Sequence, residues 1–232
     1  HMSAAAPADV AGTGPVEGMS ADIRAVLLDM DGTLVDAFGP IIYALNRTLR
    51  EYGLETMSEE DVICHTGRGE CSMISLFGEQ RETAARRFLE FHDERLYDIR
   101  PIDGASELLD WLNARDIATA IVTSKSQQRA EMQLAHLGWE RKIQAVIGLC
   151  EGRRQKPNPH TMLLACEALN TEPAQVVMIG DGIADMKAAV RAGIRPIGIS
   201  NSFSEKELEE AGATICFNSI NMVRKWLERQ IG

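Results

Sequence analysis

The chain has 232 residues, of which 45% are hydrophobic, so it is long and apolar enough to fold around one sizeable core. Its formal net charge of −10 argues against a general nucleic-acid-binding or anionic-membrane-binding surface, because both need a basic face. A small anionic substrate remains open, since such a substrate needs only a local positive site.

Residues 1–20 are expected to be a disordered tail that starts with a cloning remnant and lies outside the fold. They lack the basic start and apolar centre of a signal peptide. The longest apolar runs are only as long as strands, so no membrane-spanning helix is expected. The five cysteines include no CxxC pair, which argues against a zinc cluster or disulfide framework and favours a reducing, cytoplasmic setting.

Short apolar runs of strand length alternate with amphipathic segments along most of the chain. The runs are residues 25–28, 118–122, 145–149, 176–179, 194–199 and 213–217. The amphipathic segments lie near residues 104–115, 126–137, 158–170, 182–192 and 204–211, and a closing helix is expected at 219–230. Strands that alternate with helices predict an α/β fold, with a Rossmann-like parallel sheet and helices on both faces.

Residues 37–100 interrupt this alternation, because they contain no convincing strand and read as several helices, the clearest from about 81 to 97. We expect this helical insertion to be a small all-helical cap domain. The core domain would then comprise residues 21–36 and 101–232. Phe38-Gly39-Pro40 would mark the departure from the sheet, and Pro101 and Gly104 the return.

Polar residues follow the predicted strands at the edge where open parallel sheets bind ligands. These residues are Asp29, Asp31, Thr123, Ser124, Lys156, Asp181 and Asp185. Carboxylates that meet at one point repel each other, and Mg²⁺ binds carboxylate oxygens together with a phosphate. Thr123 and Lys156 suit phosphoryl oxygens, and Gly32 lets the backbone approach a ligand. The pattern therefore predicts a phosphoryl group held against Mg²⁺.

Four segments resemble, in order, the four motifs of the haloacid dehalogenase-like superfamily: "DMDGTLVD", "IVTSK", "KPNP" and "GDGIAD". The resemblance covers essentially residues 24–230. The helical insertion and the segment "AGATICFNSINMV" resemble its phosphoglycolate phosphatase-like branch. The resemblance implies a Mg²⁺-dependent phosphomonoester hydrolase that acts on a small phosphorylated metabolite through an aspartyl-phosphate.

The resemblance also implies a chemical role for each matching residue. Asp29 would be the nucleophile, and Asp31 would protonate the leaving oxygen and then activate water. Thr123 and Ser124 would bind phosphoryl oxygens. Lys156 would hold the nucleophile and offset developing charge.

The metal site implied by the resemblance draws on the same carboxylates. Asp29, Asp181 and the main-chain carbonyl of Asp31 would bind Mg²⁺. Asp185 would support the metal or Lys156 through hydrogen bonds from the second coordination sphere.

Single residues argue against the other reactions that members of the superfamily catalyse. A dehalogenase needs no acid at the position of Asp31, and a phosphonatase needs a cap lysine, whereas residues 37–100 contain no lysine. A sugar phosphomutase typically carries a histidine where Ile41 stands, which lowers that alternative without excluding it. A non-catalytic phospho-acceptor switch would lack both the insertion and Asp31.

The segment "CHTGRGECS" in the helical insertion is the best candidate for substrate contact. His65 there can hydrogen-bond a hydroxyl, and Arg68 can pair with a second anionic group. An equally good interpretation is a glycine-rich turn between two helices, with Arg68 solvated. Lys125 is expected to be a solvated loop lysine, with a role in binding a ligand as the alternative. Phosphoglycolate, sugar phosphates and nucleotides all remain candidate substrates, and the chain is either a monomer or a dimer.

Overall fold

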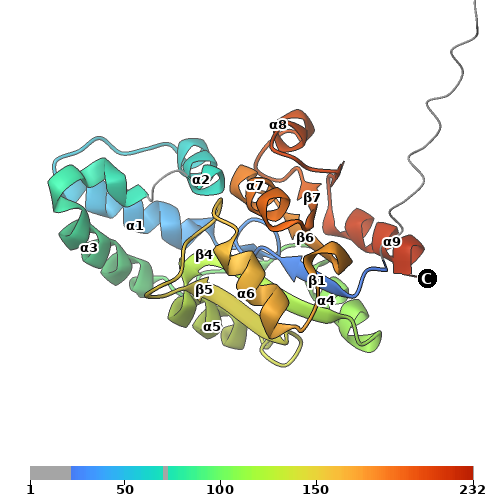
Figure 1. Cartoon of the computed structure of the whole chain (residues 1–232). Helices are drawn as coiled ribbons and strands as arrows, with labels where there is room; N and C mark the ends of the chain where they lie inside the picture. The colour runs from blue at the N-terminus through green and yellow to red at the C-terminus, as the bar shows by residue number, and fades with distance from the viewer. Residues whose placement is uncertain (1–21, 70–72, 232) are drawn as a thin grey trace, which may run out of the picture.

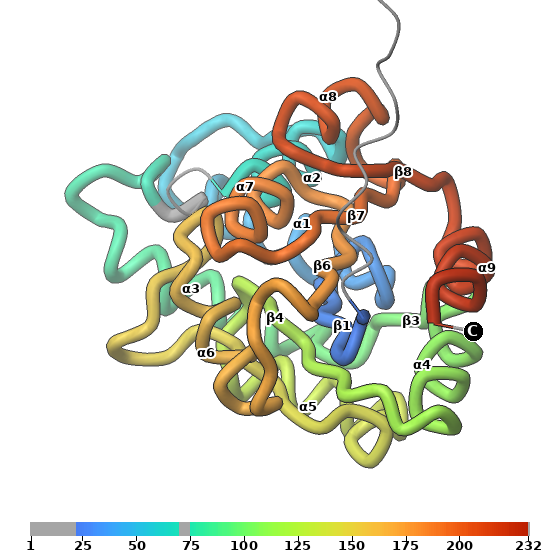
Figure 2. Tube along the Cα trace, turned by 45° about the vertical axis from the view of Figure 1, so that its right-hand side comes forward, coloured from blue at the N-terminus to red at the C-terminus, as the bar shows by residue number. Residues whose placement is uncertain are grey.

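A six-stranded sheet with the order β5-β4-β1-β6-β7-β8 forms the centre of the computed structural model, which describes residues 22–69 and 73–231. Its strands are β1 (Ala25–Leu28), β4 (Ala118–Ser126), β5 (Ala145–Leu149), β6 (Val176–Gly180), β7 (Arg195–Ile199) and β8 (Ile215–Phe217). Every neighbouring pair is parallel, which confirms the predicted sheet. Figure 2 shows β1 between β4 and β6, so residues that follow β1 stand at the middle of the sheet edge.

Helices cover both faces of the sheet, because successive side chains of a buried strand point to opposite sides. These helices are α4 (Ala105–Ala114), α5 (Gln127–His136), α6 (His160–Ala168), α7 (Ile183–Ala192), α8 (Glu205–Glu210) and α9 (Ile220–Ile231). Val26 and Leu28 of β1 pack with α4, α5 and α9, and the last of these lies beside α4 (Figures 1 and 2). Ala25 and Leu27 pack with α6 and α7 on the other face.

The helical insertion forms a small cluster of its own. Its elements are α1 (Phe38–Glu51), α2 (Glu59–Arg68), the 3-10 segment η1 (Met73–Gln80) and α3 (Arg81–Glu94). Leu45 and Leu49 of α1 are buried with Val62, Phe77 and Ala84. Figure 1 shows α1 and α3 at the end of the molecule opposite α9, whereas α2 lies beside α7 of the core. The insertion thus carries an apolar centre separate from the two faces of the sheet.

The connections to the insertion differ from the sequence-based expectation. Two short strands that we did not predict, β2 (Val35–Asp36) and β3 (Arg100–Pro101), pair antiparallel there. No local pattern announces such a pairing, because its two halves are far apart in sequence. Phe38-Gly39-Pro40 is not a connection but the first turn of α1, where the missing N–H of proline costs no helical hydrogen bond.

β4 is longer than predicted, since it continues to Ser126 beyond a shift in its register with β5. Thr123 and Ser124 therefore lie in the extension of the strand rather than after it. None of the helices in the described part of the chain combines the length and the apolar character that crossing a bilayer requires. The predicted tail and positions 70–72 of the candidate contact segment lie outside the described residues.

Candidate active site

Asp29 stands directly after β1, at the middle of the sheet edge. Its backbone N–H donates to the carbonyl of Ile179 at 2.9 Å, which extends the pairing of β1 with β6, and the residue is only 8% exposed. Lys156 Nζ donates to Asp29 Oδ1 at 2.9 Å, and Thr33 Oγ1 lies 3.5 Å from Oδ2, at the long end of a hydrogen bond. One carboxylate oxygen of Asp29 is thus fixed by a buried cation.

Lys156 is buried and has a partner for each of its ammonium protons. Besides Asp29, it donates to Asp185 Oδ1 at 2.6 Å and to the carbonyl of Val122 at 2.8 Å. Burial alone would lower the pKa of Lys156, but Asp185 and Asp29 outweigh it and raise the pKa above its ordinary value. The lysine is therefore a permanent cation, and its hydrogen bonds connect Asp29 after β1, Val122 of β4 and Asp185 of α7.

Asp29, Asp181 and Asp185 each place a carboxylate oxygen within 4.8 Å of the others. Asp181 follows β6, and Asp185 lies in the first turn of α7, where it accepts a 2.9 Å hydrogen bond from the N–H of Gly182. Burial and the charge of Asp29 raise the pKa of Asp181 and raise that of Asp185 to about 7. A divalent cation would relieve this repulsion, and buried carboxylate oxygens are ligands that suit Mg²⁺. The donor set therefore fits the expected metal.

Two hydroxyl groups that the sequence analysis did not single out hold Asp181. Thr33 Oγ1 donates to Asp181 Oδ1 at 2.9 Å, and Ser202 Oγ donates to Oδ2 at 2.5 Å. Ser202 follows β7, so the rule for strand ends was a signal that could have found it. Gly32 has a φ of +85°, and a Cβ there would meet the carboxylate of Asp181 and the ring of Phe38. Its glycine makes room for Asp181, and its predicted approach to a ligand stays a prediction.

Asp31 is joined to the helical insertion through Lys125. Lys125 Nζ donates to Asp31 Oδ1 at 3.0 Å and to Gln133 Oε1 at 2.5 Å, and Gln133 Nε2 donates to the carbonyl of Leu96 at 2.8 Å. The side chain of Lys125 is 6% exposed, so the expectation of a solvated loop lysine was wrong. Burial raises the pKa of Asp31 although Lys125 opposes the shift.

A cavity of about 330 Å³ connects this sheet edge with the helical insertion. Among the residues predicted from the strand ends, those that line it are Asp29, Asp31, Thr123, Ser124, Lys156, Asp181 and Asp185. Phe38, Ile41, Phe88 and Leu89 of α1 and α3 contribute apolar lining. The cavity thus has a charged part on the sheet edge and an apolar part on the insertion.

His65 lines the cavity, whereas Arg68, the other predicted contact of the insertion, does not. Arg68 is the last residue of α2 and is exposed, with its guanidinium carbon 6.0 Å from the ring centre of Phe203. Its contact with substrate stays a prediction that this arrangement does not support. His92 also lines the cavity and is 2% exposed, and burial lowers its pKa to about 4. A lone histidine in a helical pattern gave no sequence signal for this position.

Residues 26–199 match the haloacid dehalogenase-like hydrolase family. An N-acetylmuramic acid 6-phosphate phosphatase of Pseudomonas aeruginosa is 30% identical over 193 residues, which are 80% of this chain and 85% of that protein. A phosphoglycolate phosphatase of Rhodospirillum rubrum is 29% identical over 218 residues, 88% of this chain and 90% of that protein. A haloacid dehalogenase-like family hydrolase of Streptococcus pneumoniae has the same fold, with a TM-score of 0.80 at 20% identity over 88% of this chain and 98% of that one. On these grounds the chain belongs to the haloacid dehalogenase-like hydrolase family.

Proposed function

We propose that this enzyme is a Mg²⁺-dependent phosphatase that transfers the phosphoryl group of a small phosphorylated metabolite to Asp29 and then to water. The position of Asp29 carries the proposal. One of its carboxylate oxygens is held by the buried cation Lys156, and it shares the sheet edge with the carboxylates of Asp181 and Asp185. The names of both curated relatives, which are phosphatases, support the same reaction class.

Mg²⁺ would be held by Asp29, Asp181 and the main-chain carbonyl of Asp31, with Asp185 in support. When bound, it supplies positive charge that offsets the carboxylates and the phosphoryl oxygens. The helical insertion would act as a cap that separates the reacting groups from bulk water.

In the first step, a carboxylate oxygen of Asp29 forms a bond to phosphorus while the bond from phosphorus to the leaving oxygen breaks. That oxygen takes the proton of the Asp31 carboxyl group and departs as an alcohol. The raised pKa of Asp31 supports this role, because it favours the protonated form. Thr123 Oγ1 accepts a 3.1 Å hydrogen bond from the N–H of Lys125, so its own proton is available for a phosphoryl oxygen.

In the second step, the Asp31 carboxylate takes a proton from water, whose oxygen bonds to phosphorus. The bond between phosphorus and Asp29 breaks, inorganic phosphate leaves, and Asp31 is again protonated. Lys156 remains cationic through both steps and offsets the negative charge that develops on the phosphoryl oxygens.

Replacement of the two aspartates tests this route. Asp29→Asn should abolish turnover of an aryl phosphate, because no nucleophile remains. Asp31→Asn should lower turnover by about 10²- to 10⁴-fold and accumulate a phosphorylated chain that intact-mass spectrometry detects. Asp36→Asn is the matched control, since Asp36 lies in the same sequence segment but pairs with Arg100 outside the cavity. Undiminished turnover by Asp29→Asn would refute the covalent route. Release of one aryl alcohol per chain, with the phosphoryl group kept on Asp29 and no continued release of phosphate, would favour the phospho-acceptor switch.

A further inference from the structure

We infer that the leaving group of the substrate is an uncharged alcohol with an apolar face, and that a carboxylated leaving group such as glycolate is disfavoured. This inference rests on the proposed phosphatase activity and narrows its substrate class. It depends on two features of the cavity, namely the pairing of its cations and the apolar part on the helical insertion.

Each cation among the described lining residues already has a carboxylate partner. Lys156 is held by Asp29 and Lys125 by Asp31, as described above. Arg129 of α5 donates from Nε and Nη2 to the two carboxylate oxygens of Asp93, both at 2.7 Å. This bidentate contact occupies the Nε–Nη2 edge of the guanidinium group and already offsets its charge. A carboxylated leaving group would therefore have to compete with a side chain of the protein.

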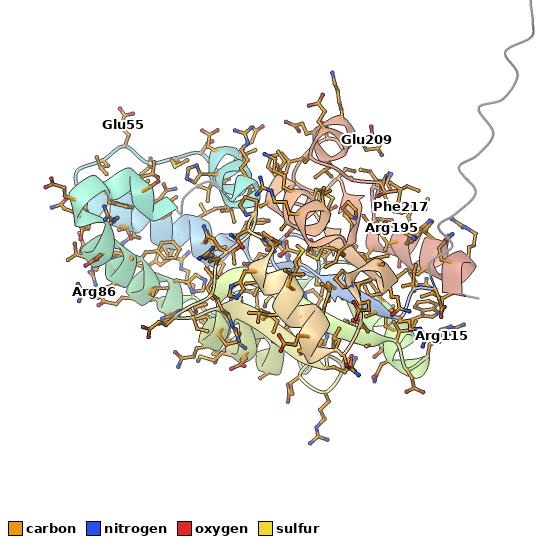
Figure 3. The ribbon with its side chains drawn as sticks, in the orientation of Figure 1. Glu55, Arg86, Arg115, Arg195, Glu209 and Phe217 are labelled. Atoms are coloured by element: carbon orange, nitrogen blue, oxygen red, sulfur yellow. The ribbon has the colours of Figure 1, made fainter. Side chains whose placement is uncertain are left out.

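Arg86 and Arg87 of the neighbouring helix α3 do not supply the missing charge, and Arg81 at the start of that helix is exposed and does not line the cavity. Arg87 donates to Glu51 at 2.7 Å and to Glu90 at 2.6 Å. Arg86 is exposed and points away from the rest of the molecule (Figure 3). Neither side chain lines the cavity.

The formal charges of the cavity point the same way. Its described lining has four carboxylates, namely Asp29, Asp31, Asp181 and Asp185, against the three cations discussed above. With Mg²⁺ and a phosphoryl dianion in place, and with Asp31 protonated as the proposed first step requires, no net positive charge remains for a second anion. A carboxylate on the leaving group would thus enter a partly buried site without a charge that compensates it, and its nearest charges would include the carboxylates of the lining.

The part of the cavity on the insertion favours an apolar group of the substrate over a charged one. Phe38 and Ile41 project from α1, and Phe88 and Leu89 from α3. The ring of His92 stacks on Phe88 with centroids 6.0 Å apart, and its lowered pKa keeps it neutral. The volume of about 330 Å³ lies in the range of small-molecule sites. An apolar face of the leaving group would remove these side chains from water.

A panel of three esters tests the inference on the unmodified enzyme with Mg²⁺. Phosphoglycolate and 2-hydroxyethyl phosphate have the same length and differ in a carboxylate against a hydroxymethyl group, and 2-phenylethyl phosphate adds an apolar ring. We expect kcat/KM for 2-hydroxyethyl phosphate to exceed that for phosphoglycolate by about tenfold, and 2-phenylethyl phosphate to be better still. Equal or better turnover of phosphoglycolate would overturn the inference.

A substitution that places a positive charge in the apolar part of the cavity gives a second test of the inference. Phe88→Arg should raise the ratio of kcat/KM for phosphoglycolate to that for 2-hydroxyethyl phosphate by about tenfold, because a charge-assisted contact becomes available. Leu76→Arg is the matched control, since Leu76 is 41% exposed in the same insertion and does not line the cavity. An unchanged ratio in a folded Phe88→Arg protein would contradict the inference. If that variant does not fold, the ester panel still decides.

Failure of the inference can be separated from failure of the proposed function. If none of the three esters is hydrolysed, the proposed phosphatase activity is wrong for these substrates. The affinities of the three intact esters for the enzyme, measured by calorimetry in the presence of Mg²⁺, then still show which leaving group the cavity prefers. Tighter binding of 2-phenylethyl phosphate than of phosphoglycolate would support the inference, and the reverse order would overturn it.

Discussion

His92 should make the stability of this enzyme depend on pH in a way that one substitution removes. Its side chain is only 3% exposed, and Nδ1 lies 3.9 Å from Asp93 Oδ1, too far for a hydrogen bond. Burial, followed by the charge of Lys125, lowers its pKa from 6.5 to about 4. Below about pH 6.5 the unfolded chain therefore binds a proton that the folded chain does not bind until about pH 4.

The sign and size of the effect follow from this difference in proton binding. The free energy of unfolding falls as the pH falls through this window, because the unfolded state binds more protons. A shift of about 2.5 pH units corresponds to about 3 kcal/mol over the whole window. Of this, about 2 kcal/mol should be lost between about pH 7.5 and pH 5.

Urea unfolding of the wild type and of His92→Phe at both pH values measures the effect. Phenylalanine keeps an aromatic ring against Phe88 but cannot bind a proton. The drop in unfolding free energy between the two pH values should be about 2 kcal/mol smaller in His92→Phe. His136→Phe, the same substitution at an exposed helix end, controls for the change of residue itself. Equal drops in the wild type and His92→Phe would refute the reasoning.

Three further outcomes follow from the site. Chelation of Mg²⁺ should abolish hydrolysis of an aryl phosphate, and readdition should restore it, because the clustered carboxylates need a counter-charge; full activity in excess chelator would contradict this. Gly32→Ala should lower the melting temperature by several degrees for each kcal/mol lost, because φ is +85° and the new Cβ meets Asp181; an unchanged melting curve would show that the turn relaxes. Arg68→Ala should leave kcat/KM for phosphoglycolate and for an aryl phosphate equally unaffected, since Arg68 lies outside the cavity; a loss confined to phosphoglycolate would restore its predicted anion contact.

Much of the fold could be predicted because its signals are local. Each strand of the parallel sheet contains a short apolar run, and β1 and β5 begin and end at the predicted residues. The pairing of β2 with β3 could not be predicted, since it depends on the two ends of the helical insertion meeting in space. Glycine and proline usually mark a connection, so Phe38-Gly39-Pro40 predicts one, although the first turn of a helix tolerates both residues.

The candidate site also contains residues that could be predicted from the sequence and residues that could not. Residues at strand ends could be placed together from topology alone, and the structure brings Asp29, Lys156 and Asp181 to one edge. A partner on a helix could not be placed, because nothing in sequence order puts Gln133 of α5 against Lys125. Glutamine is common on protein surfaces, and only tertiary contact distinguishes this one.

A side chain on α5 is linked to Asp31 through Lys125, which lies near the end of β4. Gln133 is fully buried and holds Lys125 with its oxygen while its nitrogen binds the carbonyl of Leu96, just beyond α3. A displacement of the insertion at Leu96 must therefore break or carry with it the hydrogen bond that orients Lys125. Because Lys125 in turn donates to Asp31, the position of the proposed acid and the position of the insertion are coupled through one buried amide.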